Sequence, residues 1–156
     1  MSLEKVRAHL RPFGLEGRVL ALDKPSATVG EAAAAVGCQP ARIAKTLSFL
    51  VEGQPLLVVT AGDRKIDNPK YKAAFGQKAV MIPAPSVQAL TGYPVGGVCP
   101  FALPPGVPVY LDDSLKRFED VYPAAGTGAS AVRLTLAELE ETSAARGWVD
   151  ICKEVE

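Results

Sequence analysis

The sequence predicts an α+β fold built around a curved sheet or a partly closed barrel. Helical and strand-like patterns are mixed along the 156 residues without the regular strand–helix–strand period of a doubly wound sheet. Many strand-like segments are short and bounded by Pro or Gly, which is typical of sheets that curve strongly or close. Because no repeat or linker divides the chain, we expect one domain over residues 1–156.

In the first half of the chain, apolar spacing and capping residues define the expected elements. Residues 3–13 have apolar side chains at helical spacing, which predicts a helix that ends at Gly14. Two strongly apolar segments, 45–52 and 55–61, flank a Gly-Gln pair, which predicts a β-hairpin. The same signals predict a strand at 18–22, a helix capped by Thr28 and ended by Gly37, a helical turn at 40–43, and a helix from Asn68 to Gly76.

The second half of the chain mixes short strands and short helices. Its clearest signal is the capping box of Thr135 and Glu138, which opens a helix expected to end at Gly147. Proline and glycine corners separate the remaining segments. These segments predict strands at 79–82, 107–111, 121–125, 131–134 and 148–152, a helix at 86–91 and a helical turn at 113–117.

Composition argues against several functional classes. No apolar segment is long enough to span a bilayer and the N-terminus lacks the apolar core of a signal peptide, so we expect a soluble cytoplasmic protein with no membrane partner. Cys38, Cys99 and Cys152 form no Cys-x-x-Cys pair and leave one odd thiol, which favours reduced cysteines. Because His9 is the only histidine, a zinc site and a Ser-His-Asp triad are poorly supported, and we expect no metal or cofactor.

The net charge of the chain is zero, but the charges are unevenly distributed. Residues 1–78 contain 12 Lys and Arg against 7 Asp and Glu, whereas residues 79–156 contain 5 against 10. The basic excess is either an ordinary solvated surface or a local patch for phosphates, which would bind with modest, salt-sensitive affinity. The candidate patch consists of Arg64, Lys65, Lys70, Lys72 and Lys78.

The segment at residues 93–101, Tyr-Pro-Val-Gly-Gly-Val-Cys-Pro-Phe, fits neither a regular helix nor a regular strand. Gly96 and Gly97 can adopt backbone angles that other residues avoid, and they let a ligand approach the main chain. Pro100 fixes its own φ and favours an extended conformation at Cys99. We therefore expect either a plain turn or a rigid loop whose backbone N–H groups bind an ester carbonyl as an oxyanion hole does.

Lys45 and Cys99 are the two side chains with candidate chemistry. Lys45 stands at the start of an apolar strand, where its ammonium group either reaches solvent or points into a pocket and binds an anionic oxygen. Cys99 could attack a carbonyl as a nucleophile, but no histidine accompanies it, so a small pocket-lining role is favoured. A third motif, Ala-Gly-Thr-Gly at 125–128, lacks the surroundings of a phosphate-binding loop and is by default a turn.

These three motifs occur in an order that resembles a known family. Residues 42–49, Arg-Ile-Ala-Lys-Thr-Leu-Ser-Phe, are similar to its lysine-bearing strand, and residues 96–101 are similar to its Gly-x-x-x-Pro loop. Residues 125–128 are similar to its C-terminal glycine-rich turn. The chain thus resembles the YbaK/prolyl-tRNA-synthetase-associated domain family, the trans-editing aminoacyl-tRNA deacylases, over nearly its whole length. The resemblance implies a mixed, barrel-like β-sheet flanked by helices.

The resemblance also implies hydrolysis of the ester between a wrongly attached amino acid and the terminal ribose of tRNA, usually the tRNA for proline. Lys45 would be the essential catalytic lysine, and Gly96 with its neighbours would hold the aminoacyl carbonyl. The implied partners are aminoacyl-tRNA and, as a further candidate, prolyl-tRNA synthetase, and a free-standing domain would meet its substrate in trans. The implied substrate-binding residues are Thr46, Gly96, Gly97, Val98, Cys99, Pro100 and Gly126.

Two positions differ from the family pattern. Many relatives have a small hydroxyl residue where this chain has Cys99, and some have a polar residue where it has Ala125. Both changes make the expected pocket less polar, so the sequence does not assign the edited amino acid. Two alternatives to the deacylase stay open: a non-catalytic tRNA- or synthetase-binding module of the same fold, and an enzyme that acts on another small acyl ester.

Overall fold

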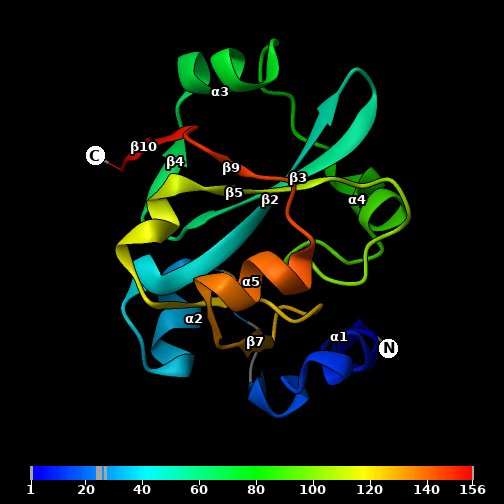
Figure 1. Cartoon of the computed structure of the whole chain (residues 1–156), viewed down its shortest axis with the longest axis vertical. Helices are drawn as coiled ribbons and strands as arrows, with labels where there is room; N and C mark the ends of the chain where they lie inside the picture. Colours follow the sequence, from blue (N-terminus) through cyan, green and yellow to red (C-terminus); the bar gives the residue numbers. More distant parts are fainter. Residues whose placement is uncertain (1, 24–25, 27, 156) are drawn as a thin grey trace.

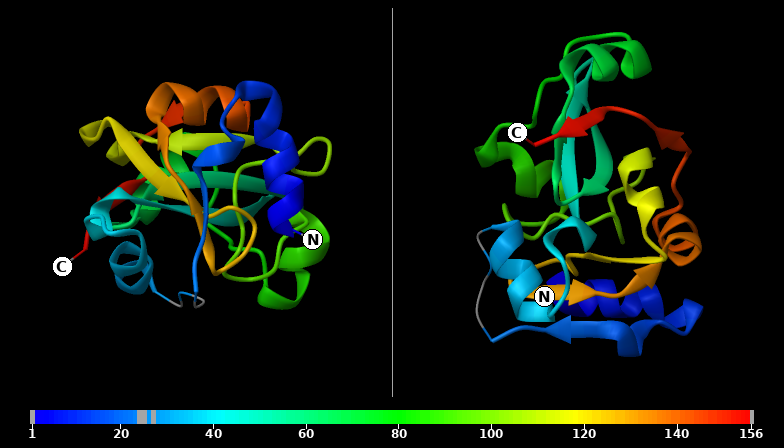
Figure 2. Two further views of the ribbon diagram at one scale, coloured as in Figure 1. Left: turned by 90° about the horizontal axis from the view of Figure 1, so that it is seen from below. Right: turned by 90° about the vertical axis from the view of Figure 1, so that its left-hand side faces the viewer.

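The computed structural model describes residues 2–23, 26 and 28–155. A mixed six-stranded sheet with the strand order β8-β6-β2-β3-β5-β9 forms its centre. The sheet curls, and helices pack around it (Figure 1, Figure 2). The expected α+β class, with a curved mixed sheet flanked by helices, is therefore confirmed.

The hairpin of β2 (Ile43–Val51) and β3 (Gln54–Ala61) contains the two longest strands of the sheet. Both strands are rich in β-branched and other apolar residues, and they pair antiparallel along eight residue pairs. Their turn contains two residues with positive φ, Glu52 at 52° and Gly53 at 78°, as a tight two-residue hairpin requires. The predicted hairpin is confirmed, but its turn is Glu52-Gly53 rather than the expected Gly53-Gln54, because Gln54 already pairs with Val51.

The other strands extend the sheet on both sides of this hairpin. β3 pairs parallel with β5 (Val109–Asp112), and β5 pairs parallel with β9 (Trp148–Val149). β2 pairs parallel with β6 (Asp120–Pro123), and β6 pairs antiparallel with β8 (Leu134–Thr135). Two antiparallel ribbons complete the strands: β1 (Val19–Ala21) with β7 (Ser130–Val132), and β4 (Arg64–Ile66) with β10 (Cys152–Glu154).

The boundaries of helix α5 (Leu136–Ser143) illustrate how capping residues define the helices. The N–H of Glu138 donates to Thr135 Oγ1 at 3.2 Å, and the N–H of Thr135 donates to Glu138 Oε1 at 2.9 Å, which is the predicted capping box. The helix ends before the expected Gly147 because Ala144 already has a left-handed φ of 51°. The other helices are α1 (Ser2–Leu10), α2 (Val29–Val36), α3 (Asn68–Phe75) and α4 (Ala84–Thr91), with 3-10 turns at Arg11–Phe13, Glu16–Arg18, Pro40–Arg42 and Asp113–Arg117.

Three of the strand predictions are wrong. The segment at 131–134 is not one strand but parts of two, β7 and β8, which pair with different partners, β1 and β6. Residues 79–82 run beside β2 but share only one isolated bridge with it, between Phe49 and Met81. The chain turns into α4 directly afterwards, at Pro83, so this contact is too short to form a ladder. The segment at 148–152 is not one strand but parts of two, β9 and β10, which pair with different partners, β5 and β4.

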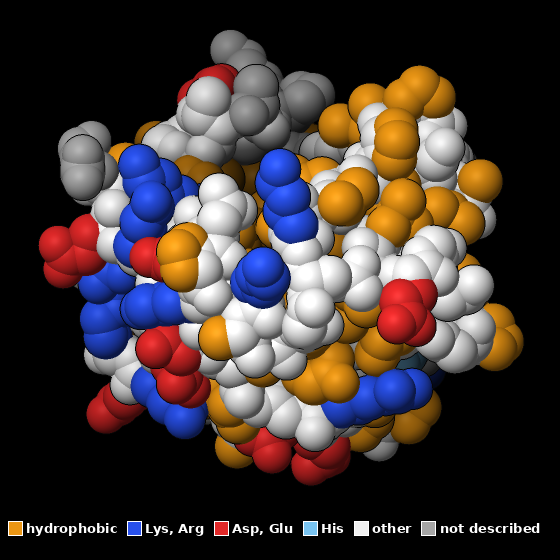
Figure 3. Space-filling model, turned by 90° about the horizontal axis from the view of Figure 1, so that it is seen from above, with side chains coloured by type: hydrophobic (Ala, Val, Ile, Leu, Met, Phe, Trp, Pro, Cys, Tyr) orange, Lys and Arg blue, Asp and Glu red, His pale blue; other side chains and the backbone are white. Residues whose placement is uncertain are grey.

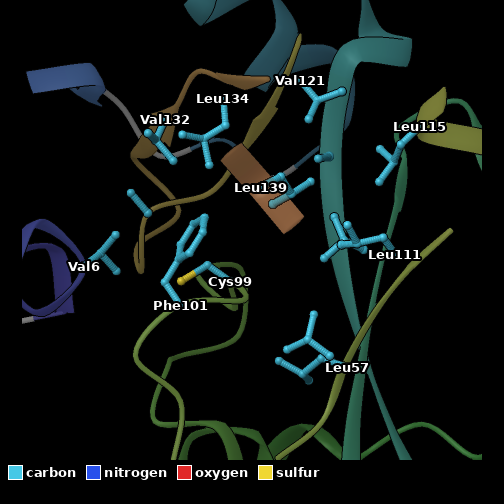
Figure 4. Packing of buried hydrophobic residues seen from close by; sticks show 14 of the residues in the cluster. Val6, Leu57, Cys99, Phe101, Leu111, Leu115, Val121, Val132, Leu134 and Leu139 are labelled. Atoms are coloured by element: carbon cyan, nitrogen blue, oxygen red, sulfur yellow. The ribbon is translucent and has the colours of Figure 1, made fainter. Parts of the chain in front are cut away.

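Apolar side chains pack on both faces of the hairpin. On one face, Leu57 and Val59 of β3 belong to the main core, which also contains the fully buried Val6 and Leu10 of α1 (Figure 4). Burying a side chain of this size stabilises a fold by roughly 1.5–3 kcal/mol, so α1 is an integral part of the domain. A second cluster, which includes side chains from α3 and the C-terminal segment, contains Phe49, Leu56, Val58, Tyr71, Ile151 and Cys152.

Candidate functional site

A cavity of about 410 Å³ opens beside β2. Its walls come from α2, the start of α4, the loop after α4 and the segment at residues 122–131. Most of the wall is apolar, and among the described residues no Asp or Glu lines it. The one charged side chain among these lining residues is Lys45. The hydroxyl side chains in the wall are those of Ser26, Thr28, Thr46, Ser48, Tyr122, Thr127 and Ser130.

The cavity forms where β2 lacks a neighbouring strand along one edge. The ladder of β2 with β6 ends at Ala44, and hydrogen bonds with the segment after α3 begin at Ser48, whose carbonyl accepts from Ile82 N–H at 3.1 Å. Peptide groups alternate between the two edges of a strand, so those of Thr46 face the gap. The Thr46 Oγ1 atom is also buried, with no hydrogen-bond partner among the described residues. Thr46 therefore has polar groups available for a ligand.

Lys45 is half-buried at the cavity. Its Nζ donates a hydrogen bond to the carbonyl oxygen of Arg64, at the start of β4. Burial lowers the pKa of the Lys45 ammonium group, and the neighbouring Cys152 and Asp63 partly oppose this shift. An ammonium group has three N–H donors, so two are left after the bond to Arg64. Lys45 is among the residues that line the cavity, whereas Arg64, whose carbonyl its amine contacts, is not.

The loop after α4 reaches the cavity through Gly96 and Val98. Gly96 has a φ of 89°, in the region that glycine adopts without strain. The N–H of Gly97 donates to Pro94 O at 2.9 Å, so this donor is already used within the loop. The sequence predicted free N–H groups along this loop, but the N–H of Gly97 is not free. Gly97 also does not line the cavity.

The glycine-rich turn at Gly126 packs directly against this loop. A Cβ atom added at Gly97 would lie 2.7 Å from Gly126 O and 2.8 Å from Thr127 Cα, so only glycine fits there. Ser130 Oγ accepts from Ala125 N–H at 3.1 Å and from Thr127 N–H at 3.3 Å, and both bonds fix the turn. Gly126 itself is not in the cavity wall, whereas Thr127 and Ser130 are.

Cys99 lies in the main core rather than in the cavity wall. Its side chain is fully buried, and Figure 4 shows its sulfur beside Phe101. Burial raises the pKa of the Cys99 thiol to about 11, so the thiol stays protonated near neutral pH and is a poor nucleophile. The expectation that Cys99 and Pro100 line the pocket is corrected, since neither contributes to the cavity wall.

Several wall residues were not identified from the sequence. Met81 and Val95 lie at the cavity with 53% and 67% of their surface exposed, although apolar residues are usually buried. No local signal separates these two from core residues. Ser130 could have been found, because a hydroxyl residue three positions after Thr127 in a glycine-rich turn commonly accepts backbone hydrogen bonds.

The expected basic patch is partly neutralised by carboxylates. Arg64 pairs with Asp63 at 3.0 Å, and Lys70 pairs with Asp150 at 3.1 Å. On the face drawn in Figure 3, Lys and Arg side chains gather mainly on the left and hydrophobic side chains on the right. Three members of the patch are exposed and form no ion pair with any described residue: Lys65, Lys72 and Lys78.

Other features of the described residues concern cysteines, metals and membranes. The three cysteines are free thiols, as expected. No group of three or more His, Cys, Asp or Glu side chains in this part of the chain is placed to hold a metal ion. None of its helices is long and apolar enough to cross a membrane.

Residues 23–142, which include every cavity-lining residue named above, match the model of the aminoacyl-tRNA editing domain. The chain belongs to this family. A crystal structure described as a candidate trans-editing enzyme for prolyl tRNA synthetase has a TM-score of 0.88 and 30% identity over 97% of each chain. The resemblance inferred from the three motifs is therefore confirmed, and so is the fold that it implies.

Two curated relatives are similar to this chain over most of its length. It is 48% identical to the uncharacterized protein YwhH of Bacillus subtilis, and the match covers 100% of both chains. It is 34% identical over 125 residues to a proline–tRNA ligase of Desulfovibrio desulfuricans. That match covers 80% of this chain but 21% of the ligase, so this chain spans about a fifth of the ligase. These comparisons support a tRNA-editing type of function.

Proposed function

We propose that this chain hydrolyses the ester bond between a wrongly attached amino acid and the terminal ribose of a tRNA, with the tRNA for proline as its substrate. The observation that carries the proposal is the meeting of Lys45 and Gly96 in the wall of one largely apolar cavity. The editing-domain family and the similarity to a proline–tRNA ligase support the substrate class. The similarity to a structure described as a candidate trans-editing enzyme for prolyl tRNA synthetase supports action in trans.

Lys45 is the proposed catalytic residue. When water attacks the ester carbonyl, negative charge develops on the carbonyl oxygen, and a nearby ammonium group stabilises that charge. The effect is larger in an apolar cavity than in water, because the effective dielectric constant is lower. The two Lys45 donors that Arg64 O does not use are available for this contact.

The proposed reaction consumes one water molecule. The water oxygen bonds to the carbonyl carbon, the bond from that carbon to the ribose oxygen breaks, and the ribose oxygen receives a proton. Thr46 would orient the acyl group through its backbone groups and its unpartnered hydroxyl at the open edge of β2. Gly96 and Val98 would hold the other side of the acyl group.

The apolar wall is proposed to select uncharged amino acids by size. Val29, Ile82 and Val98 line the cavity, and no carboxylate of the described residues is present to pair with a basic substrate side chain. An apolar pocket separates substrates that differ by one methylene by about 1–3 kcal/mol. The cavity would therefore reject large or charged side chains more strongly than it separates small ones.

A panel of mischarged tRNAs, with binding of uncharged tRNA measured in parallel, tests the proposed function. We expect release of at least one small uncharged amino acid from the tRNA for proline, with much slower release of proline itself. Binding of tRNA without hydrolysis of any panel member would contradict the proposal and favour a binding module. Hydrolysis of short acyl esters without any turnover of aminoacyl-tRNA would instead indicate a different esterase.

A further inference from the structure

The ribbon of β4 and β10 places two lysines directly opposite each other. Lys65 of β4 and Lys153 of β10 are a cross-strand pair, and both side chains are exposed. Cβ atoms in such a pair lie about 4.5–5.5 Å apart, and like charges at this separation destabilise the pairing. Neither lysine forms an ion pair with any residue that the structure describes. The repulsion between them is therefore uncompensated within the described chain.

The carboxylates near the ribbon pair with arginines rather than with the two lysines, and Asp63 also lies 2.6 Å from Arg117. Asp63 pairs with Arg64 at 3.0 Å, and Glu154 lies 3.9 Å from the same guanidinium group with 84% of its side chain exposed. Glu154 is also the cross-strand partner of Arg64, so it follows the alternation of the ribbon. Lys65 and Lys153 therefore occupy the outer face of the ribbon, beyond these ion pairs.

Hydrogen bonds hold β10 in this position, so the main-chain positions of the two lysines are fixed relative to each other. The carbonyl of Cys152 accepts from Lys70 Nζ at 2.9 Å. Ile151 N–H donates to Asp112 Oδ1 at 2.8 Å, and Ile151 O accepts from Asp67 N–H at 2.8 Å. These bonds anchor the residues just before Lys153. Two like charges on adjacent strand positions attract an anion, and their flexible side chains can both reach an anion with two charged groups.

The ribbon is linked to the cavity through one lining residue, Lys45. Lys45 Nζ donates to the carbonyl of Arg64, which is the residue directly before Lys65. Figure 3 shows Lys and Arg side chains gathered on the side of the molecule where Figure 1 places β4 and β10. A polyanion whose end enters the cavity would therefore pass close to the two lysines.

We propose that Lys65 and Lys153 form a two-point site for backbone phosphates of the tRNA acceptor end. This inference rests on the proposed function, because a tRNA ester is what brings phosphates to this cavity. The bound phosphates would neutralise the repulsion between the lysines. The site differs from the sequence-based patch in three ways. It omits Arg64 and Lys70, whose charges are already paired, and it omits Lys72 and Lys78, which do not belong to the ribbon. It includes Lys153 from the acidic half of the chain.

The double variant Lys65→Gln, Lys153→Gln tests this site against a matched control, Lys72→Gln with Lys78→Gln. Both variants remove two exposed lysine charges that have no ion pair with described residues. The first should weaken binding of uncharged tRNA about tenfold or more and reduce the salt dependence of log K by about 2, as for two lost phosphate contacts. The control should change both quantities much less. Equal effects of the two variants would overturn the proposal.

Lys65→Glu gives an independent readout with opposite signs. An opposite-charge pair with Lys153 should raise the melting temperature of the chain while it weakens tRNA binding. A raised melting temperature with unchanged tRNA affinity would overturn the phosphate site. A lowered melting temperature would also overturn it, because the two lysines would then not repel each other in the wild type. Uncharged tRNA binding does not depend on hydrolysis. If the wild type deacylates nothing but the Lys65 and Lys153 double variant still loses tRNA binding, the proposed function is refuted and the phosphate site is supported.

Discussion

The cation and the loops around the cavity are held in place by different means. Lys45 is a flexible side chain, and a single hydrogen bond to Arg64 O holds its amine. The loop side consists of two backbone segments in direct contact, where Gly97 leaves no room for a Cβ beside Gly126. Ser130 adds hydrogen bonds that fix the second of these segments.

Lys45 and the loops are therefore expected to have different roles, one catalytic and the other structural. Lys45 supplies a functional group, so removing it should abolish chemistry and leave the fold intact. The two loops can pack closely because their glycines have no Cβ atom. Adding one methyl group there should therefore damage both the fold and the activity.

Gly97→Ala should have the largest effect on stability. The new methyl group would lie 2.7 Å from a backbone oxygen, and overpacking of this kind costs about 1–3 kcal/mol. Denaturant unfolding measures the loss. Gly147→Ala is the matched control, because nothing lies within 4 Å of a Cβ there and its φ is not positive. Equal stability of the two variants would contradict the close loop contact.

Gly96→Ala should have a smaller effect on stability, for a different reason. No atom lies within 4 Å of an added Cβ, but the φ of 89° would cost an alanine roughly 1–2 kcal/mol. Because the loop would relax away from this angle, deacylation should fall more than stability does. A folded Gly96→Ala variant with wild-type kinetics would show that this loop is only a turn.

Cys99→Ser should keep deacylation within about tenfold of the wild type, because a buried, protonated thiol is not the nucleophile. Single-turnover kinetics on mischarged tRNA would measure this. Mass spectrometry is the second check, since it would detect an acyl group on Cys99. Trapping of such an intermediate would show that Cys99 is a nucleophile, and it would contradict a purely structural role of the loops.

The smallest expected effect is the pH dependence that Lys45 adds to stability. Burial lowers the Lys45 pKa, so between that pKa and the ordinary one the folded chain has released a proton that the unfolded chain keeps. The free energy of unfolding should therefore rise with pH in this window, while deacylation falls as the ammonium charge is lost. Lys45→Gln is the control, and stability curves that run parallel in both proteins would contradict a buried, charged Lys45.

Local signals predicted those parts of the fold that depend on local interactions. The hairpin around Gly53 and the capping box at Thr135 follow from neighbouring residues, and both are confirmed. The strand at 79–82 was wrong because its extent depends on where Pro83 turns the chain. β4 was not predicted, because its three residues form a strand only through pairing with β10, far away in the sequence.

The sequence predicted several residues of the site, but it did not predict which of them line the cavity and which are buried in the core. Lys45, Thr46, Gly96 and Val98 do meet at one cavity. The burial of Cys99 in the core could not be inferred, because loop residues alternate between core and surface without a fixed period. The position of Lys153 beside Lys65 was also out of reach, since it depends on ribbon register.

Steady-state deacylation by Lys45→Ala tests the central claim most directly. The substrate is a mischarged tRNA that the wild type hydrolyses, and thermal unfolding of both proteins is measured in parallel. We expect kcat/KM to fall at least about 100-fold, which corresponds to roughly 2.7 kcal/mol of transition-state stabilisation, with little change in melting temperature. A stable Lys45→Ala variant with near wild-type kcat/KM would contradict the catalytic role of Lys45 and the contrast between the two sides of the cavity.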